Sequence, residues 1–250
     1  MVDDATEARR AQGRAPGGLV VALDGPASSG KSSVGAAAAL ELRFRFCDTG
    51  LLYRAAAWLA LARQIAPEDV DRLVAETEEI ELAPDEYGRL DRVLVDGRDV
   101  TAEVHTPRVD AAVSDYARVG ELRAALLPRQ RALTDDGGII MAGRDIGTVV
   151  LPAADLKLYL DASVEERARR RAEERGVEAG TAESVEILED LRRRDAIDSG
   201  RAVAPLRIAP DAVVLRTDGN RFEETVALVV AAIRDAEASG EPAAGLRARA

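Results

Sequence analysis

The sequence contains few residues that form cross-links, bind metals or fill a core with aromatic rings. Its 250 residues include one cysteine and one histidine, and aromatic residues make up only 3%. A single cysteine excludes an intramolecular disulfide and a zinc site made of cysteines. Cys47 ends an apolar run and is predicted to pack in the interior. With so few rings, the core must be built from alanine, valine, leucine and isoleucine.

Long hydrophobic runs are missing too. The first 17 residues are polar and contain no apolar segment of the kind found in a signal peptide. The longest apolar stretch near the C-terminus, from Val226 to Ile233, is too short to cross a bilayer. These absences predict a soluble, cytoplasmic protein that has no membrane partner.

Positive charge is in deficit. The chain has 34 basic against 45 acidic residues, which gives a net charge of −11 at pH 7. A field of that sign disfavours nonspecific binding to nucleic acid or to an anionic membrane. An anionic substrate would therefore require basic side chains gathered in a local pocket.

Short apolar runs alternate with longer helical patterns along most of the chain. This alternation predicts a parallel sheet with right-handed crossovers, in which helices separate the strands. The predicted strands are residues 19–23, 44–47, 138–142, 155–160 and 212–215. The core is assigned to residues 18–64, 138–162 and 210–237.

Two segments interrupt the alternation. Residues 65–137 contain a hairpin pattern, for which Asp96-Gly97 predicts the turn, and then helices that Pro128 is expected to kink or end. Residues 163–209 are dominated by charge. We interpret both as insertions on the core, which suits an enzyme that closes over its substrate. The two ends, 1–17 and 238–250, are predicted to be a disordered arm and a flexible tail.

The strongest motif fits G-x-x-x-x-G-K-[ST] and lies between a predicted strand and a predicted helix. Its two glycines permit a tight turn whose N–H groups point at an anion, and the helix N-terminus adds partial positive charge. The lysine supplies a full charge to the β and γ phosphates, and the hydroxyl of Ser32 suits Mg²⁺. The motif predicts a site for ATP and Mg²⁺ that consists of Gly25, Pro26, Ala27, Ser28, Ser29, Gly30, Lys31, Ser32 and Ser33.

A phosphate loop alone does not fix the class of protein. GTPases of the Ras kind recognise guanine through Asn-Lys-x-Asp, but the single asparagine, Asn220, is followed by Arg221. A kinase is favoured because an arginine-rich segment occurs where a mobile lid is expected. The alternatives are a P-loop ATPase or nucleotide sensor without an acceptor, and a kinase for UMP, AMP or a small metabolite such as shikimate.

Three more polar clusters follow the phosphate loop. They are CDTGLLYR at 47–54, GRDIGTVV at 143–150 and RDAIDSGRAVAPL at 194–206. The first two directly follow predicted strands, and the C-terminal ends of parallel strands line the ligand crevice of such a sheet. Asp48 in the first cluster either caps the next helix or orders Mg²⁺ through water.

Taken together and in this order, the motifs resemble those of bacterial cytidylate kinases, over about residues 19–230. GRDIGTVV and RAVAPL are much more specific to that family than the phosphate loop is. The resemblance implies an α/β fold, the P-loop nucleoside monophosphate kinase fold, with a parallel five-stranded core sheet flanked by helices. It makes 65–137 the monophosphate-binding insertion and 163–209 the lid with its adjoining substrate-binding segment. It also implies transfer of the γ-phosphoryl group of ATP to CMP or dCMP, and we expect a monomer.

The same resemblance assigns roles to single residues. The phosphate of CMP would be held by Arg54, Arg144 and Arg201, with Tyr53 beside them. The cytosine would contact Ser114, Arg123 and Asp145. The ribose would contact Arg194 and Asp198, and the same pocket would be lined by Thr49. The ATP phosphates would be reached by the lid arginines Arg167, Arg170 and Arg171. The expected catalytic residues are Lys31, Arg144 and Arg201.

The pairing of Arg123 with Asp145 suits cytosine on chemical grounds. Asp145 can accept from the amino group at C4, and Arg123 can donate to N3 or O2. Uracil has a carbonyl at C4 and a donor at N3, so the same pair would meet it with mismatched polarity. Each buried polar group left unpaired costs about 1–3 kcal/mol. The pair therefore predicts a strong preference for cytosine over uracil.

Overall fold

The computed structural model describes residues 18–239, which contain two sheets. The larger has six strands in the order β4-β2-β7-β1-β8-β9, and all its pairings are parallel. Five of them are β1 (Val20–Asp24), β2 (Arg45–Asp48), β7 (Ile139–Gly143), β8 (Leu156–Asp161) and β9 (Val213–Arg216). These five lie within one residue of the predicted apolar runs, so the predicted parallel α/β core is confirmed.

The prediction of a five-stranded core sheet is wrong by one strand. The sixth, β4 (Arg89–Leu90), comes from the segment 65–137 and pairs with β2 through Phe46–Arg89 and Cys47–Leu90. A strand of two residues is too short to show the alternation of apolar and polar side chains by which strands are recognised in a sequence.

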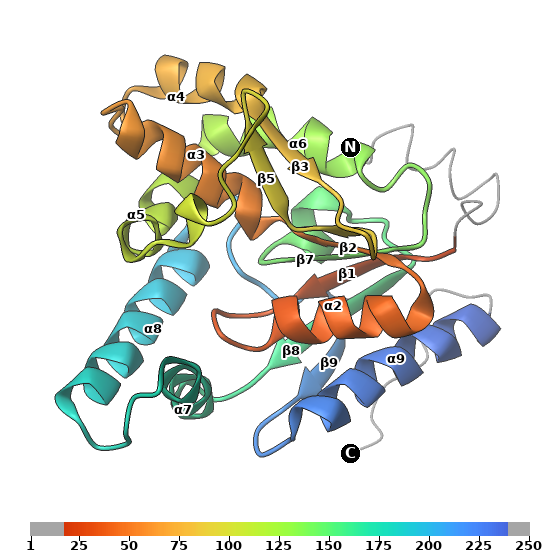
Figure 1. Ribbon diagram of the computed structural model, residues 1–250. Coiled ribbons are helices and arrows are strands. Elements are labelled where there is room, and N and C mark those ends of the chain that lie inside the picture. Colours follow the sequence, from red (N-terminus) through yellow and green to blue (C-terminus); the bar gives the residue numbers. More distant parts are fainter. Residues whose placement is uncertain (1–17, 240–250) are drawn as a thin grey trace.

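The two faces of the core sheet are covered by different helices (Figure 1). Val21 and Leu23 of β1 pack in a cluster with α2 (Lys31–Leu42) and α9 (Phe222–Ser239). Val20 and Ala22, which alternate with them, pack in a cluster that contains residues of α3 (Gly50–Ala62). Because both faces of the strand are buried, its first four residues are apolar, and only the last, Asp24, is charged.

The segment 65–137 forms the second sheet and its helices. Its other elements are α4 (Val70–Glu76), β3 (Ile80–Ala83), β5 (Arg92–Val95), β6 (Arg98–Asp99), α5 (Pro107–Ala117) and α6 (Gly120–Ala132), with short 3₁₀ turns at Thr77–Glu79 and Glu103–His105. The sheet is antiparallel, and β5 and β6 are joined through Asp96 (φ 50°) and Gly97 (φ 72°). Positive φ at both turn residues is what a two-residue hairpin turn requires, so the predicted turn is confirmed.

Helix α6 continues past Pro128 to Ala132, so the proline does not end it. The residues after it are anchored by tertiary hydrogen bonds: Arg129 donates to the carbonyls of Thr77 and Ile80, and Arg131 Nε donates to that of Val150 at 2.9 Å. These contacts offset the backbone hydrogen bond that the proline cannot make.

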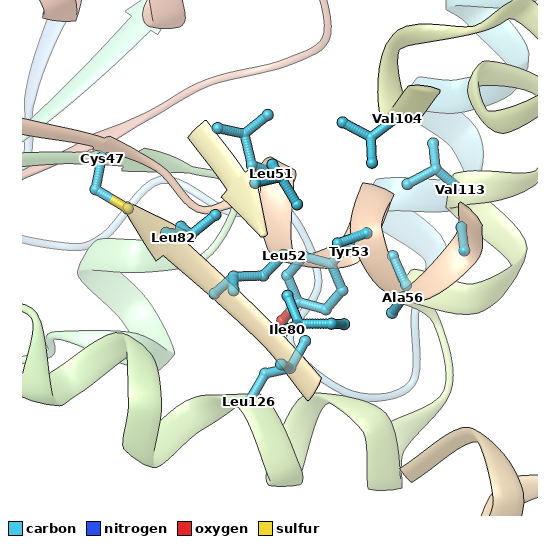
Figure 2. Packing of buried hydrophobic residues seen from close by; sticks show 14 of the residues in the cluster. Cys47, Leu51, Leu52, Tyr53, Ala56, Ile80, Leu82, Val104, Val113 and Leu126 are labelled. Atoms are coloured by element: carbon cyan, nitrogen blue, oxygen red, sulfur yellow. The ribbon is translucent and has the colours of Figure 1, made fainter. Parts of the chain in front are cut away.

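The cluster against α3 contains the cysteine and one site residue (Figure 2). Cys47 is fully buried, and burial raises the pKa of its thiol well above the usual range. A thiol held neutral and out of solvent is not a nucleophile, so the predicted packing role is confirmed. Tyr53 lies in the same cluster, and its ring links this core to the cavity described below.

The charged segment 163–209 forms two helices, α7 (Val164–Arg175) and α8 (Ala182–Gly200). Ser163 and Thr181 cap them by accepting the backbone N–H groups of Glu166 and Ser184. A small apolar cluster joins Ala168 of α7 and Leu191 of α8 to Ala27 of the phosphate loop. Figure 1 shows the turn before α2 directed toward these two helices.

Candidate active site

The phosphate loop joins the end of β1 to the start of α2, as predicted. Gly25 has φ 155°, and a Cβ there would come within 2.3 Å of the carbonyl oxygen of Leu160. Gly30, with φ 89°, is the N-cap of α2. Both positions require glycine, the first because the neighbouring strand is too close and the second because its backbone is left-handed.

Lys31 lies inside this loop. Its Nζ donates to the carbonyl oxygen of Pro26 at 2.7 Å, and the residue is 6% exposed. Burial lowers the pKa of Lys31 well below its usual range, and the charge of Arg144 adds to that, whereas Asp48 and Asp24 oppose it. A desolvated ammonium group next to several backbone N–H groups forms a strong site for an anion.

One cavity of about 820 Å³ connects the loop to the other predicted site residues. Every candidate binding or catalytic residue named above lines it except Gly25, Pro26 and Arg167. Gly25 and Pro26 shape the loop from behind. The cavity therefore brings together residues of the phosphate loop, α3, α5, α6, the loop after β7 and α8, which are far apart in the sequence.

Three of the lining residues form an ion network that joins α8 to the loop after β7. Asp198 accepts from Arg144 Nε at 2.8 Å and also from Arg201. Burial alone would raise the pKa of Asp198, but Arg144 and Arg201 outweigh it and hold that pKa below its usual range. Burial lowers the pKa values of Arg201 and Arg194. The network concentrates positive charge in a protein that is acidic as a whole.

Arg123 and Asp145 form a buried pair that also lines the cavity, and their charges act on Arg201 of the network. Arg123 Nη2 donates to Asp145 Oδ2 at 2.5 Å, and the two side chains are only 7% and 5% exposed. The guanidinium also lies 5.0 Å from the centre of the Tyr53 ring. Among the described residues, Arg123 Nε and Arg201 Nε are buried donors without a hydrogen-bond partner. Such donors suit a ligand that brings acceptors into the cavity.

Arg54 is tied to the segment 65–137. Its Nη1 donates to the carbonyl of Val104 at 3.1 Å and its Nη2 to Asp110 at 2.5 Å. Arg171 of α7 lies 3.8 Å from the same carboxylate. The sequence reasoning missed Asp110, although it precedes Ser114 by one helical turn and so shares its face of α5.

The three arginines predicted to reach ATP behave differently. Arg170 and Arg171 line the cavity, and Arg170 also contacts Thr217 after β9. Arg167 does not line it: its side chain is 5% exposed, pairs with Asp195 of α8 at 2.5 Å and donates to the carbonyl of Ala27 at 3.0 Å. Arg167 therefore makes structural contacts, because this face of α7 packs on the phosphate loop, and its contact with ATP stays a prediction.

Replacing Arg167 by alanine should destabilise the protein by about 3 kcal/mol, because it leaves the partly buried Asp195 and the carbonyl of Ala27 without their partner. Arg169→Ala provides the control, since that side chain is 51% exposed and should contribute little. Urea unfolding of both variants measures the difference. Equal midpoints for the two variants would show that the buried contacts of Arg167 do not stabilise the fold.

Two further features of the cavity were missed or left open. At the start of α9 the cavity is also lined by Asn220, Phe222 and Thr225. Their position could have been predicted from the sequence, because this turn follows β9 at the C-terminal end of the parallel strands. Asp48 precedes Thr49, the N-cap of α3, and its Oδ1 accepts the N–H of Gly50 at 2.9 Å, so it contacts the start of the helix. Its other oxygen accepts from the Ser32 hydroxyl, so Asp48 also adjoins the predicted Mg²⁺ ligand.

The sequence is similar to a known protein family and to several of its members. The family model described as cytidylate kinase matches residues 21–235. A cytidylate kinase of Pelotomaculum thermopropionicum is 43% identical over 85% of this chain and 95% of its own length. One of Geobacillus kaustophilus is 42% identical over 87% of this chain and 97% of its own. A bifunctional pantoate ligase/cytidylate kinase of Synechocystis is 45% identical over 84% of this chain, which spans 42% of that longer protein.

Within residues 18–239, no helix has the length and apolar character needed to span a membrane.

Proposed function

This chain belongs to the cytidylate kinase family, and from that premise we propose that it transfers the γ-phosphoryl group of ATP to CMP or dCMP, which yields ADP and CDP or dCDP. The observation that carries the proposal is a single cavity lined both by Lys31 of the phosphate loop and by the Arg123–Asp145 pair. A donor site and a site suited to cytosine thus share one space.

The donor half would bind the triphosphate at the start of α2. The N–H groups of the loop and the ammonium group of Lys31 would neutralise charge on the transferring phosphoryl group. Arg170 and Arg171 would add charge from α7, since both line the cavity.

The acceptor half would hold the phosphate of CMP with Arg54, Arg144 and Arg201. That phosphate is already ionised near neutral pH, so the reaction needs no strong general base. The work of the protein is to align the acceptor oxygen with the γ-phosphorus and to neutralise spread negative charge. Asp198 supports this by holding Arg144 and Arg201 in place.

Mg²⁺ is the metal ion that we propose for this site. Ser32 and Asp48 offer hard oxygen donors side by side, and Mg²⁺ takes few protein ligands and keeps several waters. When bound, it would neutralise phosphate charge. The described residues include no cluster of three or more acidic, histidine or cysteine side chains suited to a protein-only metal site, so the ion would depend on the nucleotide phosphates for the rest of its ligands.

The three parts of the chain would divide the work. Residues 65–137 supply Ser114 and Arg123 on the acceptor side, and residues 163–209 supply arginines to both sides. We propose that 163–209 closes over the nucleotides and excludes water, which would otherwise hydrolyse ATP. We also propose a cytoplasmic monomer whose partners are small nucleotides; the acidic net charge disfavours binding to nucleic acid or to an anionic membrane.

The test is an acceptor panel. We expect kcat/KM to be highest for CMP or dCMP among CMP, dCMP, UMP, AMP and shikimate, and we expect CDP and ADP to appear in equal amounts. ATP turnover that is unchanged by CMP would contradict the proposal and favour an ATPase or a nucleotide sensor. Equal kcat/KM for CMP and UMP would contradict the role proposed for Asp145.

A further inference from the structure

Asp24 is a buried carboxylate that belongs to neither half of the cavity. It is the last residue of β1, directly before the phosphate loop, and it is 4% exposed. At this C-terminal end of the sheet, its side chain contacts the loop that follows the neighbouring strand β7. Oδ1 accepts the backbone N–H of Ile146 at 2.8 Å, and Oδ2 accepts that of Gly147 at 2.7 Å.

The loop that Asp24 holds is the one that carries Arg144 and Asp145. Residues Ile146–Val150 form one turn of π-helix directly after them. The first N–H groups of a helical turn have no partner inside the turn, and Asp24 accepts two of them. The fit is close, since a Cβ on Gly147 would lie 3.3 Å from Asp24 Oδ2 and 3.1 Å from Lys157 Cδ.

We propose that Asp24 is a positioning residue for the acceptor site: its carboxylate fixes the start of the turn at 146–150 and thereby fixes Arg144 and Asp145 relative to the phosphate loop. The inference rests on the proposed function, because it assigns Asp145 to the base and Arg144 to the phosphate of CMP. Asp24 does not line the cavity and acts through the backbone. Since it adjoins the phosphate loop along the chain, it ties the acceptor half to the donor half.

The protonation state of Asp24 matters for this role. Burial raises its pKa to about 6, although the two backbone hydrogen bonds lower it; of the neighbouring charges, Asp145 raises it and Lys31 lowers it. A protonated carboxyl has a hydrogen on one oxygen, so one of the two N–H groups then loses its acceptor. Acceptor binding should therefore weaken as the pH falls through about 6.

Folding stability should move the other way. A carboxyl with a raised pKa binds more protons in the folded than in the unfolded state between its two pKa values. Its contribution to stability thus falls as the pH rises from the ordinary value of 3.8 to about 6. The loss of acceptor binding in mild acid is therefore not an unfolding effect of this group.

The experiment compares Asp24→Asn with Asp155→Asn. The amide has the same shape, but its single oxygen can accept a hydrogen bond from only one of the two N–H groups. Its NH₂ group then faces the other N–H, and the two donors repel each other. We expect kcat/KM for CMP to fall about 10²-fold, with the KM for ATP nearly unchanged. Asp155 is the matched control, because its Oδ2 accepts the N–H of Val20 at 2.8 Å at the opposite end of β1. Asp155→Asn should leave both constants at the wild-type value.

The pH profile separates positioning from mere stabilisation. The ratio of wild-type to Asp24→Asn kcat/KM cancels the ionisations of the substrates and should fall below about pH 6. If Asp24→Asn does not fold, inhibition of the wild type by cytidine provides the test. Cytidine carries no phosphate group, and it should inhibit competitively with CMP and more weakly below that pH. A flat ratio, or Asp24→Asn kinetics equal to those of Asp155→Asn, would overturn the inference. Wild-type protein that fails to phosphorylate CMP would instead refute the proposed function.

Discussion

Replacing Lys31 by methionine is expected to lower kcat by about 10³-fold for every acceptor without destabilising the fold. Methionine keeps the unbranched stem and removes the charge next to the transferring phosphoryl group. The loss is common to all acceptors because Lys31 belongs to the donor half of the cavity.

The stability result follows from the burial of Lys31. Burial lowers the pKa of its ammonium group, so the folded state binds that proton less tightly than the unfolded state does. Below the unfolded pKa such a group therefore costs stability, and the cost shrinks as the pH rises. Removing it offsets the lost hydrogen bond to Pro26, worth about 1 kcal/mol. We expect a Tm at pH 7 that equals or exceeds that of the wild type.

The other lysine of the chain is the control. Lys157 is also buried, in β8, but it pairs with Asp211 at 2.9 Å and does not line the cavity. Lys157→Met should keep wild-type kcat and lose some stability. If Lys31→Met retains more than a small fraction of the activity, or if both variants lose activity alike, the charge of Lys31 does not act on the reacting phosphate.

The elements that the sequence predicted well are those set by local patterns. Both faces of the inner strands are buried, so these strands appear in the sequence as unbroken apolar runs. The phosphate loop requires glycine at two positions, which makes its motif recognisable. The order of the strands was not predicted, because right-handed crossovers restrict which face of the sheet each connection covers but leave several orders open. Because parallel strands place their C-terminal ends together, residues near 31, 49 and 144 could be expected in one cavity, and they are.

The remaining features depend on contacts that no local pattern contains. β4 has two residues and exists because β2 offers it an open edge. The arginines of α7 share one composition, and only the packing of α7 on the phosphate loop directs Arg167 inward and leaves Arg170 and Arg171 at the cavity. No local pattern reveals the role of Asp24 at the end of its strand, since the two N–H groups that donate to it lie more than a hundred residues away.

Replacing Asp145 by asparagine should remove most of the preference for CMP over UMP. Two unpaired buried polar groups at about 1–3 kcal/mol each predict a preference of about 10²-fold or more in the wild type. Asparagine can offer its amino group to the C4 carbonyl of uracil, so kcat/KM should fall for CMP and change little for UMP. The ratio of the two constants, measured at one pH, is the readout.

Two comparisons make this result specific to the base. Arg54→Ala should lower kcat/KM for CMP and UMP by the same factor, because Arg54 is proposed to hold the phosphate that both acceptors share. Stability must be measured in parallel, since Arg123 is buried against the lost charge and a buried pair that loses a partner costs about 3–5 kcal/mol. Asparagine can still accept from Arg123 or from the base, but a single amide oxygen serves both poorly. If the ratio of kcat/KM for CMP to that for UMP were unchanged in a folded Asp145→Asn variant, another group in the cavity, not Asp145, would select the base.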